Sequence, residues 1–168
     1  MKKIVALTHH TFEDLELMYP VYRIREENIE VVIAGLEKET IYTGKNGYPC
    51  KSDIAFKDLK ASDYDGVLIP GGFAPDKVRR IPEALSLLQE LHREKKMIAF
   101  ICHGGWVPIS AKILKGRKAT GTVAIKDDLE NAGAIWVDEP VVIDGHLISS
   151  RTPVDLPSFG KAMAEFLR

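Results

Sequence analysis

The sequence contains little cysteine and no long hydrophobic run. Cys50 and Cys102 are the only cysteines among 168 residues, too few to form a disulfide framework. We therefore expect both thiols to stay reduced, as in the cytoplasm. No apolar run approaches the ~20 residues of a membrane-spanning helix. Residues 1–3 are basic, but the apolar stretch behind them is short, so we expect a first strand there and neither a signal peptide nor a membrane partner.

The sequence also lacks an excess of charge of either sign. Its 23 basic and 24 acidic residues give a formal net charge of -1, so nothing in the charge favours nucleic acid as a partner. The phosphate-binding patterns G-x-x-x-x-G-K-[ST] and G-x-G-x-x-G after a strand are both absent, which argues against a nucleotide. His9, His10, Cys102 and His103 could bind a metal only if separate loops brought them together. We expect no cofactor and no metal.

The most informative stretch that is present begins at residue 97. Residues 97–101 are five apolar residues, a pattern typical of a short buried strand. Cys102 follows at once, then Gly104 and Gly105, and apolar residues recur beyond them at helical spacing: Trp106, Ile109 and Ile113. This order of strand, sharp turn and helix predicts a nucleophile elbow with cysteine in place of serine.

A side chain at such an elbow projects beyond the end of the sheet, where a substrate can reach it. The free N–H groups of the following helix would favour the thiolate of Cys102, which is the nucleophilic form. The alternative is a buried structural cysteine, a common fate of free cysteine. The position at a strand exit favours the functional interpretation. Cys50 falls in a predicted hairpin, and we expect it to be an ordinary thiol.

The rest of the chain alternates between strand and helix patterns. With 45% hydrophobic and 28% charged residues, it predicts one compact domain spanning residues 1–168. Buried strands are expected at 3–8, 30–36, 66–70 and 97–101, with shorter strands at 118–122 and 135–137. Helices are expected at 12–22, 82–96, 125–132 and 157–168, and hairpins at 40–52 and 141–148. This order predicts a doubly wound α/β sandwich around a mostly parallel sheet.

In such a sheet, ligands bind beyond the carboxyl ends of the strands. Three predicted ends carry suggestive residues: 9–13, Gly71 with Gly72, and Cys102 with His103. Glycines allow close backbone approach, so the N–H groups of Gly71 and Gly72, with that of His103, could form an oxyanion hole. The alternative for the two glycines is simply a tight turn.

Several motifs, in this order, resemble the ThiJ/PfpI family, and in particular its PfpI-type intracellular protease branch. They cover essentially the whole chain: Phe12-Glu13-Asp14-x-Glu16, Pro70-Gly71-Gly72-x-Ala74-Pro75, Ile101-Cys102-His103-Gly104, Lys115-Gly116-Arg117-Lys118, Asn131-Ala132-Gly133 and Ser150-Arg151-Thr152-Pro153-x-Asp155-Leu156. The resemblance implies a flavodoxin-like sandwich related to class I glutamine amidotransferase domains.

The resemblance also implies roles for individual residues. Cys102 would be the nucleophile with His103 beside it, and Glu13 would supply a carboxylate near the thiol. Asp76 matches a position from which a neighbouring subunit completes the site in this branch, and Arg151 would contact substrate. Two departures stand out. Gly105 replaces the usual proline after Cys-His-Gly, and Asp76 is one methylene shorter than the usual glutamate.

Together these observations predict a cytoplasmic cysteine-dependent hydrolase or lyase. The resemblance leaves peptidase, glyoxalase III and deglycase activities open, so the partner would be a small carbonyl compound, a glycated adduct or a peptide. It also implies a homodimer or higher homo-oligomer, with residues 72–80 near an interface. Two other readings remain: a stress-related redox sensor in which Cys102 is oxidised without turnover, and a ligand-binding domain that has lost the chemistry.

Overall fold

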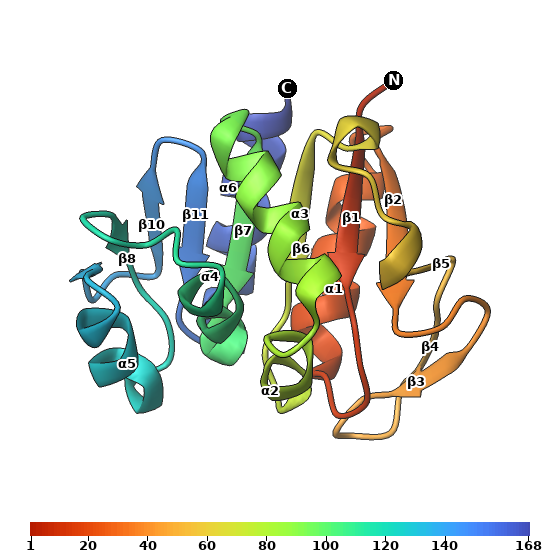
Figure 1. Cartoon of the computed structure of the whole chain (residues 1–168), viewed down its shortest axis with the longest axis horizontal. Coiled ribbons are helices and arrows are strands. Elements are labelled where there is room, and N and C mark those ends of the chain that lie inside the picture. The colour runs from red at the N-terminus through yellow and green to blue at the C-terminus, as the bar shows by residue number, and fades with distance from the viewer.

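The computed structural model describes all 168 residues, arranged around one twisted sheet (Figure 1). Its strand order is β10-β11-β7-β6-β1-β2-β5. Every neighbouring pair is parallel except β10 and β11, which form an antiparallel hairpin. The strands are β1 (Lys3–Leu7), β2 (Glu30–Gly35), β5 (Ile54–Ala55), β6 (Gly66–Ile69), β7 (Met97–Ile101), β10 (Val141–Asp144) and β11 (Leu147–Ser150). The predicted mostly parallel α/β sheet is therefore confirmed.

Helices cover both faces of this sheet. Figure 1 shows α3 in front of it, with α1 and α6 behind. The helices are α1 (Asp14–Arg25), α2 (Ala74–Val78), α3 (Pro82–Arg93), α4 (Trp106–Ser110), α5 (Lys126–Asn131) and α6 (Leu156–Leu167). Two small sheets lie outside the central one: β3 (Ile41–Thr43) with β4 (Pro49–Lys51), and β8 (Lys118–Ala119) with β9 (Ile135–Trp136). None of the helices has the length and apolar character needed to cross a membrane.

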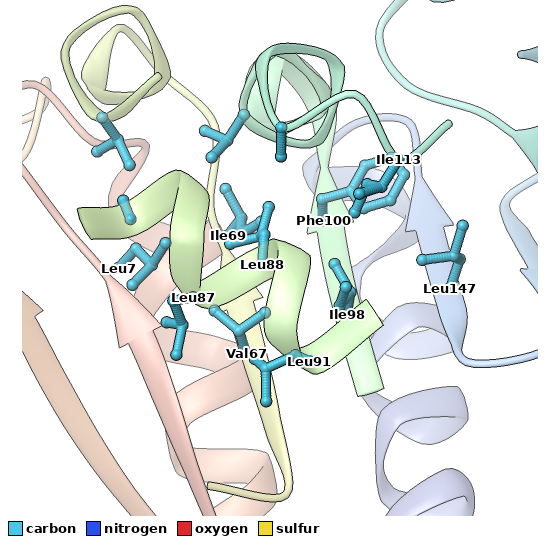
Figure 2. Packing of buried hydrophobic residues seen from close by; sticks show 14 of the residues in the cluster. Leu7, Val67, Ile69, Leu87, Leu88, Leu91, Ile98, Phe100, Ile113 and Leu147 are labelled. Atoms are coloured by element: carbon cyan, nitrogen blue, oxygen red, sulfur yellow. The ribbon is translucent and has the colours of Figure 1, made fainter. Parts of the chain in front are cut away.

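The continuous apolar runs of the central strands follow from burial on both faces. Successive side chains of a strand point to opposite faces, and in β1 Val5 and Leu7 belong to one apolar cluster while Ile4 and Ala6 belong to the other. Figure 2 shows the first cluster, in which leucines of α3 pack on the sheet. Its labelled residues include Leu7, Val67, Ile69, Leu87, Leu88, Leu91, Ile98 and Phe100. This packing holds the carboxyl ends of β1, β6 and β7 side by side.

The loops that follow β1 and β6 are joined to each other. The N–H of Glu13 donates to the carbonyl of Gly71 at 3.0 Å, and the N–H of Phe73 donates to that of Thr11 at 2.8 Å. The β3–β4 turn is joined to the same loops, because the N–H of Lys45 donates to the carbonyl of Phe12 at 2.9 Å. Three segments far apart in sequence therefore surround the carboxyl end of β7.

Candidate active site

Cys102 lies directly after β7, where the chain turns sharply. Its φ is +58°, a left-handed conformation that is rare for residues other than glycine. Such a conformation persists only where the surrounding structure imposes it, and it is common at functional sites. The side chain is half-buried. The predicted elbow geometry is therefore present at Cys102.

The helix after the elbow is shorter than the sequence predicted. Residues 102–105 form one turn of 3-10 helix, and α4 then runs only from Trp106 to Ser110. Ile113, expected on the same helix, lies beyond its end. The helix ends because Lys112, directly after its C-cap Ala111, adopts a left-handed conformation with a φ of +59°. The dipole of so short a helix is a weak source of thiolate stabilisation.

The carboxyl group against Cys102 belongs to Glu16, and the expectation that Glu13 would occupy this place is wrong. Glu13 is the N-cap of α1, where its Oε2 accepts the N–H of Glu16 at 2.8 Å. One helical turn on, the fully buried side chain of Glu16 reaches the loop after β6 and the Cys102 thiol. Both glutamates lie at the predicted start of the helix, three residues apart. The structure uses Glu13 as the N-cap, which leaves Glu16 to face Cys102.

Gly71 is what allows Glu16 and Cys102 to approach each other. Its N–H donates to Oε1 of Glu16 at 2.9 Å. A Cβ at this position would lie 2.4 Å from that oxygen and 2.9 Å from the Cβ of Cys102. Because its N–H is used by Glu16, Gly71 cannot also serve an oxyanion hole, which corrects that part of the prediction.

Gly72 differs from Gly71 in both conformation and hydrogen bonding. Its φ is +77°, and a Cβ there would lie 2.4 Å from the N of Glu13, so only glycine fits. Its N–H donates to no atom of the chain, and it lines the same pocket as Cys102. An N–H group left free beside a nucleophile is suited to hold a developing oxyanion.

The ionisation of Cys102 and Glu16 is linked. Burial, and then the charge of Glu16, raise the pKa of the Cys102 thiol to about 12. Burial, and then the charge of Glu13, raise the pKa of the Glu16 carboxyl to about 8. Since the two anions would repel, the pair retains at least one proton near neutral pH and titrates as a unit.

Two other groups of the site lower the pKa of the Cys102 thiol. The backbone N–H of His103 hydrogen-bonds the sulfur and lowers the pKa of Cys102, and the charge of Lys45 lowers it further. The ring Nδ1 of His103 lies 3.5 Å from Sγ of Cys102. Burial, and then Lys45, lower the pKa of His103 below its ordinary value, so the imidazole is neutral at pH 7 and able to accept a proton.

Asp76 makes no hydrogen bond or ion pair with His103 within the chain. It lies on α2 with an exposed side chain, and its Oδ2 pairs with Nη2 of Arg80 at 3.1 Å. A single copy of the chain therefore leaves His103 without a carboxylate partner. The proposed contribution of Asp76 from a second subunit stays a prediction.

Arg151 does not reach the Cys102 pocket, contrary to the expectation that it would contact substrate there. Its guanidinium binds both carboxyl oxygens of Asp155, at 2.9 and 3.1 Å, and Oδ1 of Asp138 at 3.0 Å. These two carboxylates, Asp155 first, raise the pKa of Arg151. Arg151 instead lines a separate surface pocket of about 500 Å³ beside Trp136.

The pocket that holds Cys102 is small, about 120 Å³. It is lined by Glu13, Glu16, Lys45, Gly72, Phe73, Cys102, His103 and Pro153. The sequence did not indicate Lys45, Phe73 and Pro153 as part of this pocket, because they lie on loops whose meeting cannot be inferred from strand patterns.

Asp14 gives the position of Lys45 a physical cause. Its Oδ1 accepts the N–H of Asn46 at 3.0 Å, and its Oδ2 accepts that of Tyr48 at 2.9 Å. The side chain thereby fixes the turn between β3 and β4 that carries Lys45. The sequence shows Asp14 only as one of several acidic residues at a predicted helix start, so this contact could not be predicted from it.

A thiol held at a strand-to-helix turn of a flavodoxin-like sandwich, with a buried carboxyl beside it and an unused N–H group across the pocket, makes Cys102 the candidate nucleophile. The family model described as DJ-1/PfpI family matches residues 2–166. The chain belongs to this family.

Individual relatives agree with this assignment. Deglycase PH1704 of Pyrococcus horikoshii is 45% identical over 166 residues, which cover 99% of both chains. Deglycase PfpI of Pyrococcus furiosus is 43% identical over 166 residues, again 99% of both. Among solved structures, a two-domain protein of Anabaena variabilis containing DJ-1/ThiJ/PfpI-like and ferritin-like domains matches with a TM-score of 0.97 and 40% identity. That match covers 99% of this chain and 48% of the other.

Proposed function

We propose that this chain is a cytoplasmic cysteine-dependent enzyme of the deglycase type, which removes small carbonyl adducts from thiols or amines. One observation carries the proposal: the Cys102 thiol stands against the buried Glu16 carboxyl in a pocket of about 120 Å³. The names of the relatives described above support the same reaction class.

The size of the pocket supports a small adduct rather than a peptide. Sites for drug-sized ligands usually enclose ~300–1,000 Å³, whereas about 120 Å³ here accommodates only a fragment of a few atoms. The carrier of the adduct would remain outside, near Phe73, whose side chain is 65% exposed. A peptidase would instead need a groove for several residues on each side of the scissile bond.

The chemistry follows from the positions of three groups. The sulfur of Cys102 adds to the carbonyl carbon of the adduct, and the π pair of the C=O bond moves to oxygen. The free N–H of Gly72 then stabilises that oxyanion. Glu16 enters the reaction protonated, because its pKa is raised to about 8: it donates a hydrogen bond to the sulfur and gives its proton to the departing thiol or amine.

The overall reaction balances without an oxidant or reductant. For a thiol carrying methylglyoxal as a hemithioacetal, adduct and one water give the free thiol and lactate: the hydrogen on the hemithioacetal carbon moves to the neighbouring ketone carbon, so that the first carbon is oxidised as the second is reduced, the bond from carbon to the carrier sulfur breaks, and water supplies the carboxylate oxygen. His103 is neutral at pH 7 because its pKa is lowered by burial and by Lys45, and its Nδ1 is close enough to Cys102 to relay a proton between water and the sulfur.

Turnover by the purified protein tests the proposal. The substrate is the hemithioacetal of methylglyoxal with N-acetylcysteine, and free thiol and lactate are measured. The parent and Cys50→Ser should turn over alike, and Cys102→Ser should be at least about 100-fold slower. Cleavage of a fluorogenic peptide without release of lactate would favour a peptidase instead. Equal rates for parent and Cys102→Ser would refute a cysteine mechanism.

Redox sensing is a second candidate function, and it is favoured because Cys102 is the one thiol of the two that is accessible. Cys102 is half-buried and open to a pocket, whereas Cys50 is buried. Hydrogen peroxide should then oxidise Cys102 to sulfenic or sulfinic acid and leave Cys50 reduced. Selective oxidation in a protein that shows no turnover would support this candidate over the enzyme.

A further inference from the structure

A second cavity, larger than the Cys102 pocket, lies beside it. It encloses about 590 Å³ and is lined by Arg79, Trp106, Ile109, Lys112, Lys115, Asp128, Asn131 and Ala132. The two sites share a wall of aromatic rings: His103 of the Cys102 pocket meets Trp106 of this cavity edge to face, with ring centroids 5.1 Å apart. None of the residues lining the larger cavity takes part in the chemistry proposed for Cys102.

The cavity is strongly positive in a chain whose net charge is -1. Three cations line it, and no carboxylate lies within ion-pair distance of any of them: Arg79, Lys112 and Lys115. The only acid in the lining is Asp128, and its Oδ2 accepts the indole N–H of Trp106 at 2.9 Å. Asp128 therefore positions the ring and neutralises none of the three cations directly.

The guanidinium of Arg79 is held in place by two contacts that leave its terminal nitrogens free. Its Nε donates to Oγ of Ser110 at 2.9 Å, and its guanidinium lies over the Trp106 ring, 5.3 Å from the centroid. Its two terminal nitrogens donate to no atom of the chain. A planar guanidinium fixed in this way with free N–H groups matches the geometry of phosphate oxygens.

We propose that this cavity binds a small organic phosphate. The three cations would hold the dianionic group, and the apolar surface of Trp106, Ile109 and Ala132 would contact the organic part. The volume lies within the ~300–1,000 Å³ typical of small-molecule sites. Phosphate is preferred to a single carboxylate because three cations without ion-pair partners line this one cavity, and one negative charge would satisfy only one or two of them. The site does not depend on the function proposed for Cys102.

Fluorescence of Trp106 reports directly on this cavity. The chain has two tryptophans, so Trp136→Phe leaves Trp106 as the only one. Phenyl phosphate and inorganic pyrophosphate are titrated into this variant, with phenol as the uncharged control. Calorimetry on the parent protein repeats the measurement without a substitution. Saturable binding of phenyl phosphate, weaker binding of pyrophosphate and none of phenol are expected.

Charge-removal variants then locate the site. The double variant Lys112→Ala/Lys115→Ala and the single variant Arg79→Gln should each weaken binding of phenyl phosphate at least about tenfold. The matched control Lys57→Ala/Lys60→Ala removes the same charge from exposed positions outside the cavity and should change binding less than twofold. Binding of pyrophosphate alone would show a plain anion site and overturn the organic part of the proposal. No saturable binding, or equal weakening by the control, would overturn it entirely.

Discussion

Glu16 and Cys102 meet across Gly71, which has no side chain to keep them apart. The N–H of Gly71 binds one oxygen of the carboxyl at 2.9 Å, and the other oxygen, Oε2, is buried without a hydrogen-bond partner. A carboxyl held in this way, out of water and near a second acid, keeps its proton more readily than an exposed one. The proposed chemistry depends on that proton.

Replacing Glu16 should change how the stability of the fold depends on pH. Its pKa is raised from 4.5 to about 8, so between these values the folded state binds more protons than the unfolded state. Stability should therefore fall as pH rises from about 5 to 8, by on the order of 2–4 kcal/mol. Glu16→Gln cannot ionise, and its stability should stay flatter over this window. Urea unfolding at a series of pH values measures both proteins, and parallel curves would contradict the raised pKa.

The two cysteines should differ in reactivity. Cys102 is half-buried and opens to a pocket that a small reagent can enter, whereas Cys50 is buried. Iodoacetamide at mildly acidic pH should label Cys102 first, and Cys50 should react at a comparable rate only in denaturant. Mass spectrometry of the labelled peptides gives the order, and equal labelling of the native protein would remove the basis for a special Cys102.

Asp76 should matter only in an assembly. Within one chain it is exposed and pairs with Arg80, and His103 has no carboxylate partner. We expect a homodimer or larger oligomer in which Asp76 of one copy approaches His103 of another. Light scattering at micromolar concentration should show more than one chain. Asp76→Ala should then lower turnover more than it lowers alkylation of Cys102, because it would act through His103. A monomer with full activity would contradict this.

The histidine pair between α3 and the β10–β11 hairpin should make the fold sensitive to acid. Nε2 of His146 lies 2.9 Å from Nδ1 of His92, and burial, then His92, lower the pKa of His146 to about 4. The unfolded chain binds a proton near pH 6.5 that the folded chain binds only near pH 4. Stability should thus be lost as pH falls through this window. The loss should be smaller in His146→Gln, as measured by circular dichroism during acid titration.

Much of the fold could be predicted because strand and helix patterns are local. The apolar runs of β1, β6 and β7 and the Asp144-Gly145 turn of the last hairpin are visible in the sequence, and the structure confirms them. Short elements were harder. The helix after Cys102 ends early at Ser110 because Lys112 adopts a left-handed conformation, whereas apolar spacing alone extends the pattern to Ile113.

The position of Cys102 could be predicted, whereas its partner could not. Glu13 and Glu16 stand on the same helix start, and sequence spacing does not say which caps the helix and which turns into the pocket. That depends on the loop after β6, whose Gly71 N–H draws Glu16 inward. The positions of Lys45 and Arg151 also depend on loop contacts. Asp14 fixes the turn that carries Lys45, and Asp155 binds Arg151 outside the Cys102 pocket.

The central claim is that Glu16, and not Glu13, supplies the proton that supports the Cys102 thiolate. Thiolate formation, followed as the rate of Cys102 alkylation by iodoacetamide from pH 5 to 11, tests it most directly in Glu16→Gln, Glu16→Leu and Glu13→Ala, each with Cys50→Ser. Glutamine keeps a donor and leucine does not, so the leucine variant should form thiolate at least about one pH unit higher than the glutamine variant. Glu13→Ala should lose ~0.5–2 kcal/mol of stability from the cap while titrating within about half a unit of the parent. Identical titration of the two Glu16 variants, together with a shift in Glu13→Ala, would contradict the claim.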